Sequence, residues 1–79
     1  MLLDVSRVHP NPDYSMLIVF ENGEKKLFDM RPYLDQKPWD NLKNQSIFLR
    51  AFVRDGTIAW PGNYDIDPET LYELSVSIR

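Results

Sequence analysis

The stretch that decides the fold lies near the carboxyl end, where residues 60–72 read Trp-Pro-Gly-Asn-Tyr-Asp-Ile-Asp-Pro-Glu-Thr-Leu-Tyr. Aspartate is a preferred helix N-cap, because its carboxylate accepts hydrogen bonds from the free N–H groups of the first turn. Proline suits the next position, because no N–H donor is needed there and the φ angle of proline is already helical. We therefore expect Asp67 to cap a C-terminal helix that starts at Pro68, and Trp60 to end a strand.

The predicted helix has one apolar face. Leu71 and Leu74 are three residues apart, with Tyr72 beside them, so this face is expected to dock the helix on a sheet. The interpretation of the whole stretch is therefore architectural, and it covers Trp60, Asp65, Asp67, Pro68, Leu71 and Tyr72.

A first hairpin is predicted at Asn22-Gly23, between two apolar runs. This dipeptide favours a two-residue type I′ turn, in which both central residues have positive φ. Such a turn places Leu17 opposite Phe28 on one side of the sheet. It places Ile18 opposite Leu27 on the other side. Both faces would then be apolar, so one should carry helices and the other should meet more sheet or a second chain.

A second hairpin is predicted at Asp55-Gly56 by the same turn chemistry. The expected register places Val53 opposite Ile58 and Phe52 opposite Ala59. Further strands are expected over residues 2–8, 14–21 and 24–30, and short helices over residues 38–42 and after an N-cap at Asn44. The sequence thus predicts an α+β fold for residues 1–79 as a single domain, with a small antiparallel sheet built from hairpins and short helices that include the C-terminal one.

Composition narrows the class of protein. The chain has no cysteine, and its net charge of −3 comes with basic residues that are scattered along the sequence. Direct binding to nucleic acid is disfavoured, because phosphate backbones require clustered Lys and Arg. No segment has the roughly 18–20 apolar residues that cross a bilayer, and no signal sequence is evident. We expect a cytoplasmic protein that does not contact a membrane.

Candidate reactive groups have structural explanations in this sequence. Asn63, Asp65 and Asp67 could supply oxygen ligands to a cation, but the spacing is not that of an EF-hand loop, and capping accounts for Asp67. His9 is the only histidine, and no nucleophile, base and orienting group occur together. We therefore predict no catalytic residue, no metal and no cofactor.

Three aromatic residues are candidates for a protein interface. Tyr33, Trp39 and Tyr64 fall in expected loops or short helices, and exposed Trp and Tyr are frequent anchors of protein–protein contacts. Packing at the margin of the core is the competing interpretation for each of them.

The chain resembles the small bacterial family catalogued as domain of unknown function 2442. The resemblance is carried by residues 14–20, Asn22-Gly23-Glu24, Phe28-Asp29, residues 42–48, residues 55–60 and residues 65–72. It implies a small α+β domain with an antiparallel sheet, without assigned catalytic residues. Many members are encoded beside another small protein, an arrangement similar to a toxin–antitoxin pair.

These observations lead to two hypotheses. The first is a non-enzymatic protein-binding module, the antitoxin-like partner in a two-protein operon, which binds a small protein encoded by a neighbouring gene. The alternative is a small regulatory domain that binds nucleic acid or a metabolite. A homo-oligomer stays open in either case, because pairing would help a domain with a thin stability margin.

Overall fold

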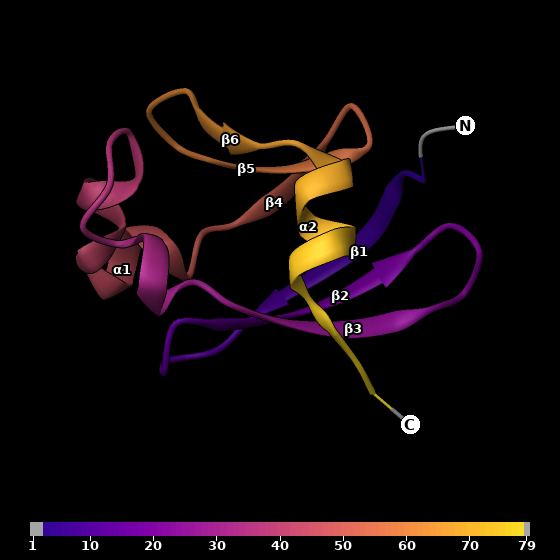
Figure 1. Ribbon diagram of the computed structural model, residues 1–79. Helices are drawn as coiled ribbons and strands as arrows, with labels where there is room; N and C mark the ends of the chain where they lie inside the picture. The colour runs from indigo at the N-terminus through magenta and orange to yellow at the C-terminus, as the bar shows by residue number, and fades with distance from the viewer. Residues whose placement is uncertain (1–2, 79) are drawn as a thin grey trace.

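The computed structural model describes residues 3–78 and contains two antiparallel sheets with short helices between them (Figure 1). The α+β fold class is therefore confirmed. The elements in chain order are β1 (Val5–Pro10), β2 (Ser15–Phe20), β3 (Lys25–Asp29), the 3-10 helices η1 (Arg31–Tyr33) and η2 (Trp39–Lys43), α1 (Gln45–Phe48), β4 (Phe52–Arg54), β5 (Thr57–Trp60), β6 (Tyr64–Ile66), α2 (Pro68–Leu74) and β7 (Val76–Ser77).

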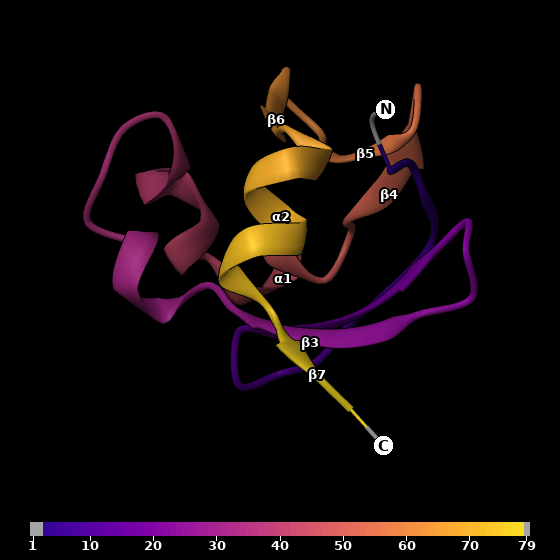
Figure 2. The same ribbon diagram turned by 45° about the vertical axis from the view of Figure 1, so that its right-hand side comes forward.

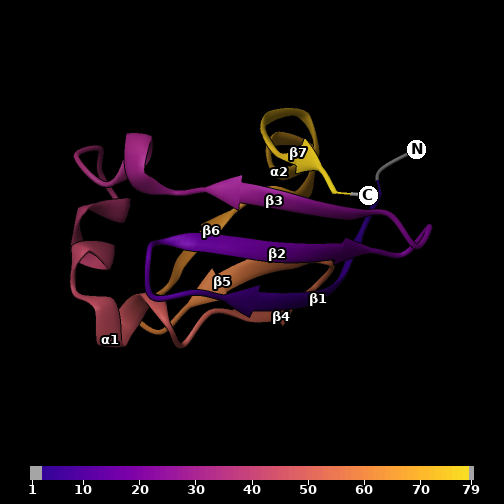
Figure 3. The same ribbon diagram turned by 90° about the horizontal axis from the view of Figure 1, so that it is seen from below.

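The two sheets form two layers. The larger sheet has the strand order β1-β2-β3-β7, and the smaller has the order β4-β5-β6. Helix α2 and the smaller sheet lie on the same side of the larger sheet, while α1 and the neighbouring turns close one end (Figures 1 and 2). Seen from below, the larger sheet lies in front of the smaller sheet and α2, with α1 beside one end (Figure 3). One face of the larger sheet is therefore covered, and no other element of residues 3–78 covers the second face, which we call bare.

The core fills the space between the layers. Trp60 is fully buried, and its indole N–H donates a hydrogen bond to the carbonyl of Phe48 at 3.1 Å. This bond leaves no unpaired donor when the large ring is removed from water. The larger fully buried side chains are Trp60, Phe20, Phe28, Phe48, Met16, Ile18, Met30, Leu42, Ile58 and Leu71.

The β2–β3 hairpin has a different turn from the predicted one. The N–H of Gly23 bonds to the carbonyl of Phe20, and Gly23 has a φ of +88°, whereas Asn22 is not among the residues with positive φ. This is a three-residue loop, a type I turn followed by a left-handed glycine. The pairing consequently shifts by one residue, so that Leu17 faces Leu27 and Met16 faces Phe28. The predicted register was wrong.

Burial explains the shift. Strand β2 turns Met16, Ile18 and Phe20 toward the core. The predicted register would have put Lys25, Leu27 and Asp29 beside them, with two charges. The observed register instead puts Glu24, Lys26 and Phe28 beside them, with Met30 next on the same face. The number of charges is the same, but two apolar side chains, Phe28 and Met30, are buried in place of one, and Tyr72 bonds to both Lys26 and Glu24. Because a one-residue slip exchanges the two faces of a strand, burial of Phe28 and Met30 selects the longer loop.

The β4–β5 hairpin confirms its prediction. Asp55 and Gly56 have φ angles of +51° and +78°, as a type I′ turn requires. Val53 faces Ile58, and Phe52 faces Ala59. The sequence rule therefore succeeds in one hairpin and fails in the other.

Helix α2 starts as predicted. The Asp67 carboxylate accepts a hydrogen bond from the N–H of Thr70 at 3.4 Å, and Pro68 occupies the first helical position. The helix docks on the larger sheet as expected, with Leu71 fully buried. Leu74 is 50% exposed, so its assignment to the docking face was wrong. Leu74 is the last helical residue, and the backbone leaves the helical conformation at Ser75. Ser75 is buried there instead of Leu74.

Some boundaries also differ from the prediction. Strand β1 covers Val5–Pro10 rather than residues 2–8, and Leu2 lies outside the described residues. Strands β6 and β7 were not predicted, although β6 bonds to β5 along its length. Asn44 caps α1 through the N–H of Ser46, as predicted. In residues 3–78 no helix has the length and apolar character to cross a membrane.

Candidate functional site

The bare face of the larger sheet presents two rows of side chains that cross its strands. We call this surface the outer face and define it by the two rows together. One row contains Arg7, Val19, Lys25 and Ile78, and the other contains His9, Leu17, Leu27 and Val76. Residues opposite one another on adjacent strands point to the same side, so each row is one line of neighbours.

A bulge in β1 brings two of these side chains to the outer face. Val5 pairs with Phe20, and Arg7, two residues later, pairs with the next residue, Val19. Ser6 is thus the extra residue, and its hydroxyl donates to the Val19 carbonyl at 3.1 Å. A bulge re-aims the side chains that follow it. Without it, Arg7 would point toward the core, as Val5 does.

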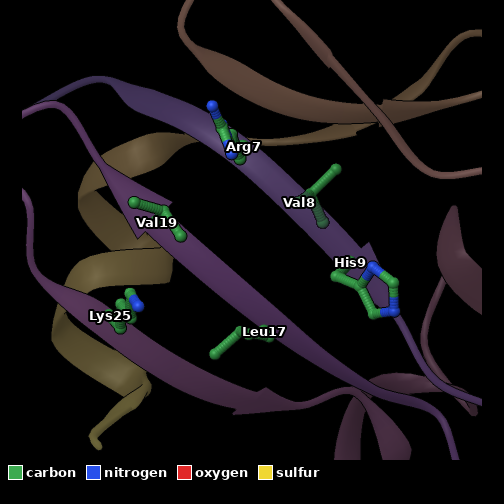
Figure 4. A pocket seen from close by; sticks show the side chains of 6 residues that line it. All are labelled: Arg7, Val8, His9, Leu17, Val19 and Lys25. Carbon is green, nitrogen blue, oxygen red and sulfur yellow. The ribbon is translucent and has the colours of Figure 1, made fainter.

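An open hollow lies on the outer face over β1, β2 and β3. Its volume is about 400 Å³, and its lining is Arg7, Val8, His9, Leu17, Val19 and Lys25. Figure 4 shows these side chains on the surface of the sheet, with α2 behind it. Apolar side chains lie in the middle of the hollow, and cationic ones stand at its edges.

The apolar part of the outer face is exposed to solvent. Val76 is 70% exposed, Ile78 is 44% exposed and Leu27 is 39% exposed. Leu17 and Val19, in the neighbouring strand β2, are half-buried. Five neighbouring aliphatic side chains thus remain in contact with water on one face of the sheet. Contiguous apolar patches of this kind are typical of interaction sites.

The charges in the two rows are of one sign, and Asp29, two residues after Leu27 in β3, lies on the same side of the sheet just beyond them. Arg7 and Lys25 are exposed, and neither forms an ion pair with a residue in the described part of the chain. Beyond the two rows, Asp29 forms an ion pair with Arg31 at 2.8 Å, and the hydrogen bonds from Arg31 lower the pKa of that carboxyl. The Asp29 carboxylate is therefore already paired with Arg31, whereas Arg7 and Lys25 have no ion-pair partner in the described part of the chain.

The inner face carries a buried lysine at the end of α2. The ammonium of Lys26 donates to the carbonyl of Tyr72 and lies 3.7 Å from the centre of the Tyr72 ring. The Tyr72 hydroxyl donates to Glu24 at 2.8 Å, which lowers the pKa of Glu24 and raises that of Tyr72. A cation suits the negative carboxyl end of a helix. Lys26 therefore anchors α2 to β3.

The three predicted interface aromatics lie elsewhere. Trp39 donates from its indole nitrogen to the Asp65 carbonyl at 3.0 Å. The Tyr64 hydroxyl accepts a hydrogen bond from Asn41, so two hydrogen bonds join η2 to β6. Tyr33 stacks on Phe28 with ring centres 5.6 Å apart. All three are half-buried against the core, and an interface role stays a prediction for them.

The acidic residues of the C-terminal stretch have the contacts of structural groups. Asp65 is largely exposed and forms an ion pair with Arg54 at 3.7 Å, while Asp67 caps α2. Within residues 3–78, no group of three or more histidine or carboxylate side chains is placed to hold a metal ion. His9 is exposed on the outer face.

The family described as "Protein of unknown function (DUF2442)" matches residues 5–77, which include both sheets and all the helices. The chain belongs to this family. No curated protein and no solved structure matches it. The match covers the outer face up to Val76.

Sequence reasoning did not identify the outer face. The predicted register assigned the apolar residues of the first hairpin to the wrong faces of the sheet. The bulge that turns Arg7 to the outer face has no signature in the sequence. One signal was present, because Val76 and Ile78 alternate with polar Ser75 and Ser77. Such alternation is typical of an edge strand with one apolar side.

Proposed function

We propose that this protein is a non-enzymatic protein-binding module and that it binds its partner through the outer face. In this proposal it is the antitoxin-like member of a pair of small proteins encoded side by side. The observation that carries the proposal is the exposure of five aliphatic side chains on a sheet face that no other described element covers.

The layer architecture supports this proposal. A sheet is stable when an apolar face is covered by a second layer, and the inner face is covered by α2 and the smaller sheet. The outer face has apolar residues of the same type as the inner face, including Leu17 and Val19 in the central strand. A partner on this side would supply a third layer.

Co-purification of the tagged protein with the product of the neighbouring gene tests the proposal. We expect the double variant Leu27→Ser/Val76→Ser to lose the partner. The matched control is Leu49→Ser/Leu74→Ser, because those leucines are 40% and 50% exposed outside the outer face. The control should retain the partner. Equal retention by both variants, each with the melting temperature of the wild type, would contradict binding through this face.

The alternative, a regulatory domain that binds nucleic acid or a metabolite, has support from the hollow between Arg7 and Lys25, which combines cations with aliphatic walls. Retention on heparin, together with salt-dependent binding of single-stranded RNA, would favour this function. The apolar surface extends beyond the hollow to Leu27, Val76 and Ile78, which favours a protein partner.

A further inference from the structure

We infer that the outer face selects an acidic partner, namely a protein surface with an aliphatic centre and two carboxylates about 10 Å apart. This inference rests on the proposed function and adds the chemistry of the partner. It follows from the charges of the two rows, their spacing and the residues that separate them.

The first argument is the sign of the charge. The chain as a whole carries a net charge of −3, with 12 acidic and 9 basic residues. The two rows nevertheless contain two cations, Arg7 and Lys25, and no carboxylate. Complementary potentials across an interface guide association and exclude wrong partners. A cationic face on an acidic chain therefore indicates a partner of opposite charge.

The second argument is geometry. Arg7, Val19 and Lys25 are direct neighbours on three successive strands. Adjacent strands are about 4.8 Å apart, so the two cations stand about 10 Å apart on either side of an aliphatic residue. A partner that places an apolar side chain on Val19 can bring carboxylates to both flanks. Its carboxylates would replace water around two cations that form no ion pair within residues 3–78.

Two other occupants fit the outer face less well. A second copy of the chain, packed face to face, would bring two Arg7 and two Lys25 side chains into one interface, and like charges at an interface are unfavourable. Nucleic acid would find His9 as the single ring in the two rows on which to stack a base, at the edge of an aliphatic surface. The aliphatic centre favours a protein.

Carbodiimide cross-linking tests the inference, because the reagent condenses an amine and a nearby carboxylate into an amide. The tagged protein is expressed in its native host, purified with its bound proteins and treated with the reagent. Mass spectrometry of the digested product should find Lys25 joined to an aspartate or glutamate of another protein. Linkage of Lys25 to a second copy of this chain, or release of the bound material by nuclease, would overturn the inference.

Charge-reversal variants provide the matched comparison. Arg7→Glu/Lys25→Glu should reduce the retained partner by about tenfold or more, because attraction becomes repulsion at two points. The control is Lys37→Glu/Arg50→Glu, which makes the same change at two exposed cations outside the outer face. It should change retention by less than about twofold, in line with the small effect of distant surface charges. All four positions are exposed, so circular dichroism should show folded protein in each case.

The results separate this inference from the proposed function. If Leu27→Ser/Val76→Ser releases the partner while both charge variants retain it, the outer face is an interface and the acidic partner is refuted. If no outer-face variant changes the captured proteins, the proposed function itself fails. Loss of the partner in Arg7→Glu/Lys25→Glu alone among the charge variants, together with a Lys25 cross-link, supports both.

Discussion

The two hairpins start from nearly the same dipeptide and fold into different turns. Asn22-Gly23 lies in a three-residue loop, whereas Asp55-Gly56 forms the two-residue type I′ turn. A Cβ atom added at Gly23 would meet nothing within 4 Å, while one at Gly56 would lie 2.6 Å from the Asp4 carboxylate. The comparison teaches that, where a turn has no contacts with the rest of the protein, burial of the strand side chains decides its length and type.

The packed turn has contacts that support its local preference. The N–H of Val5 bonds to the Gly56 carbonyl at 2.8 Å, which joins the β4–β5 turn to the first strand of the other sheet. Its strands are also short, so a slip there would move few side chains. In the β2–β3 hairpin, longer strands carry more apolar area, and their burial outweighs the turn.

The largest difference in the free energy of unfolding is expected between substitutions at Phe28 and Leu27, which are neighbours in β3. Phe28→Ala should destabilise the protein by about 3–5 kcal/mol, because it leaves a cavity in the core. Leu27→Ala should cost about 1 kcal/mol or less, because that side chain is partly in water. Urea unfolding followed by tryptophan fluorescence measures both values. A larger loss for Leu27→Ala than for Phe28→Ala would mean that the strands pair in the register of a two-residue turn.

The next effect concerns the two lysines of the same strand. Lys26→Ala should cost about 1.5–3 kcal/mol, because it removes a charged hydrogen bond to the Tyr72 carbonyl together with a cation–π contact. Lys25→Ala should be within about 0.5 kcal/mol of the wild type, since Lys25 is exposed. The same unfolding experiment compares them. Equal losses would show that β3 does not present these residues to opposite faces.

A smaller loss of stability is expected when either turn glycine, Gly23 or Gly56, is replaced by alanine. Both have positive φ, so alanine at either position should cost about 1–2 kcal/mol of backbone strain. Gly56→Ala should cost more than Gly23→Ala, because Asp4 must also move. Thermal melts of both variants check this order. Asp4→Ala/Gly56→Ala should recover the additional loss, and a double variant no more stable than Gly56→Ala would exclude the contact with Asp4 as its cause.

The smallest effect is a pKa change in the β2–β3 hairpin. The Tyr72 hydroxyl is the main cause of the lowered pKa of Glu24, whose ordinary value is 4.5, and a bond from Asn22 adds to it. A lowered carboxyl pKa contributes stability that is complete above pH 4.5 and is lost as the pH falls through the lower folded value. Tyr72→Phe should raise the pKa of Glu24 and make the stability less dependent on pH in that range.

A carboxyl titration by nuclear magnetic resonance measures this change. Asp29 is the internal control, because its pKa is held low mainly by Arg31 and should stay unchanged in Tyr72→Phe. A Glu24 pKa that does not move would show that α2 does not reach this hairpin through Tyr72.

The candidate site could be predicted from the sequence only in part. The aliphatic residues of the first hairpin were recognised as a two-sided apolar strand pair, which is why a covered and a second apolar face were expected. The residues assigned to each face were wrong, because the faces depend on the length of one turn. Arg7 could not be placed, since its direction depends on a bulge that the pairing with β2 creates.

The sequence by itself determined the features that depend on local chemistry. Asp67 and Pro68 start a helix because a cap acts over three residues, and Asp55-Gly56 has the local preference for positive φ that its turn requires. Tertiary structure decided the rest. The first hairpin slipped by one residue because Phe28 and Met30 lose more contact with water that way, and this slip left Lys25 and Leu27 on the outer face. Burial is a sum over the whole fold, so no single segment of the chain encodes it.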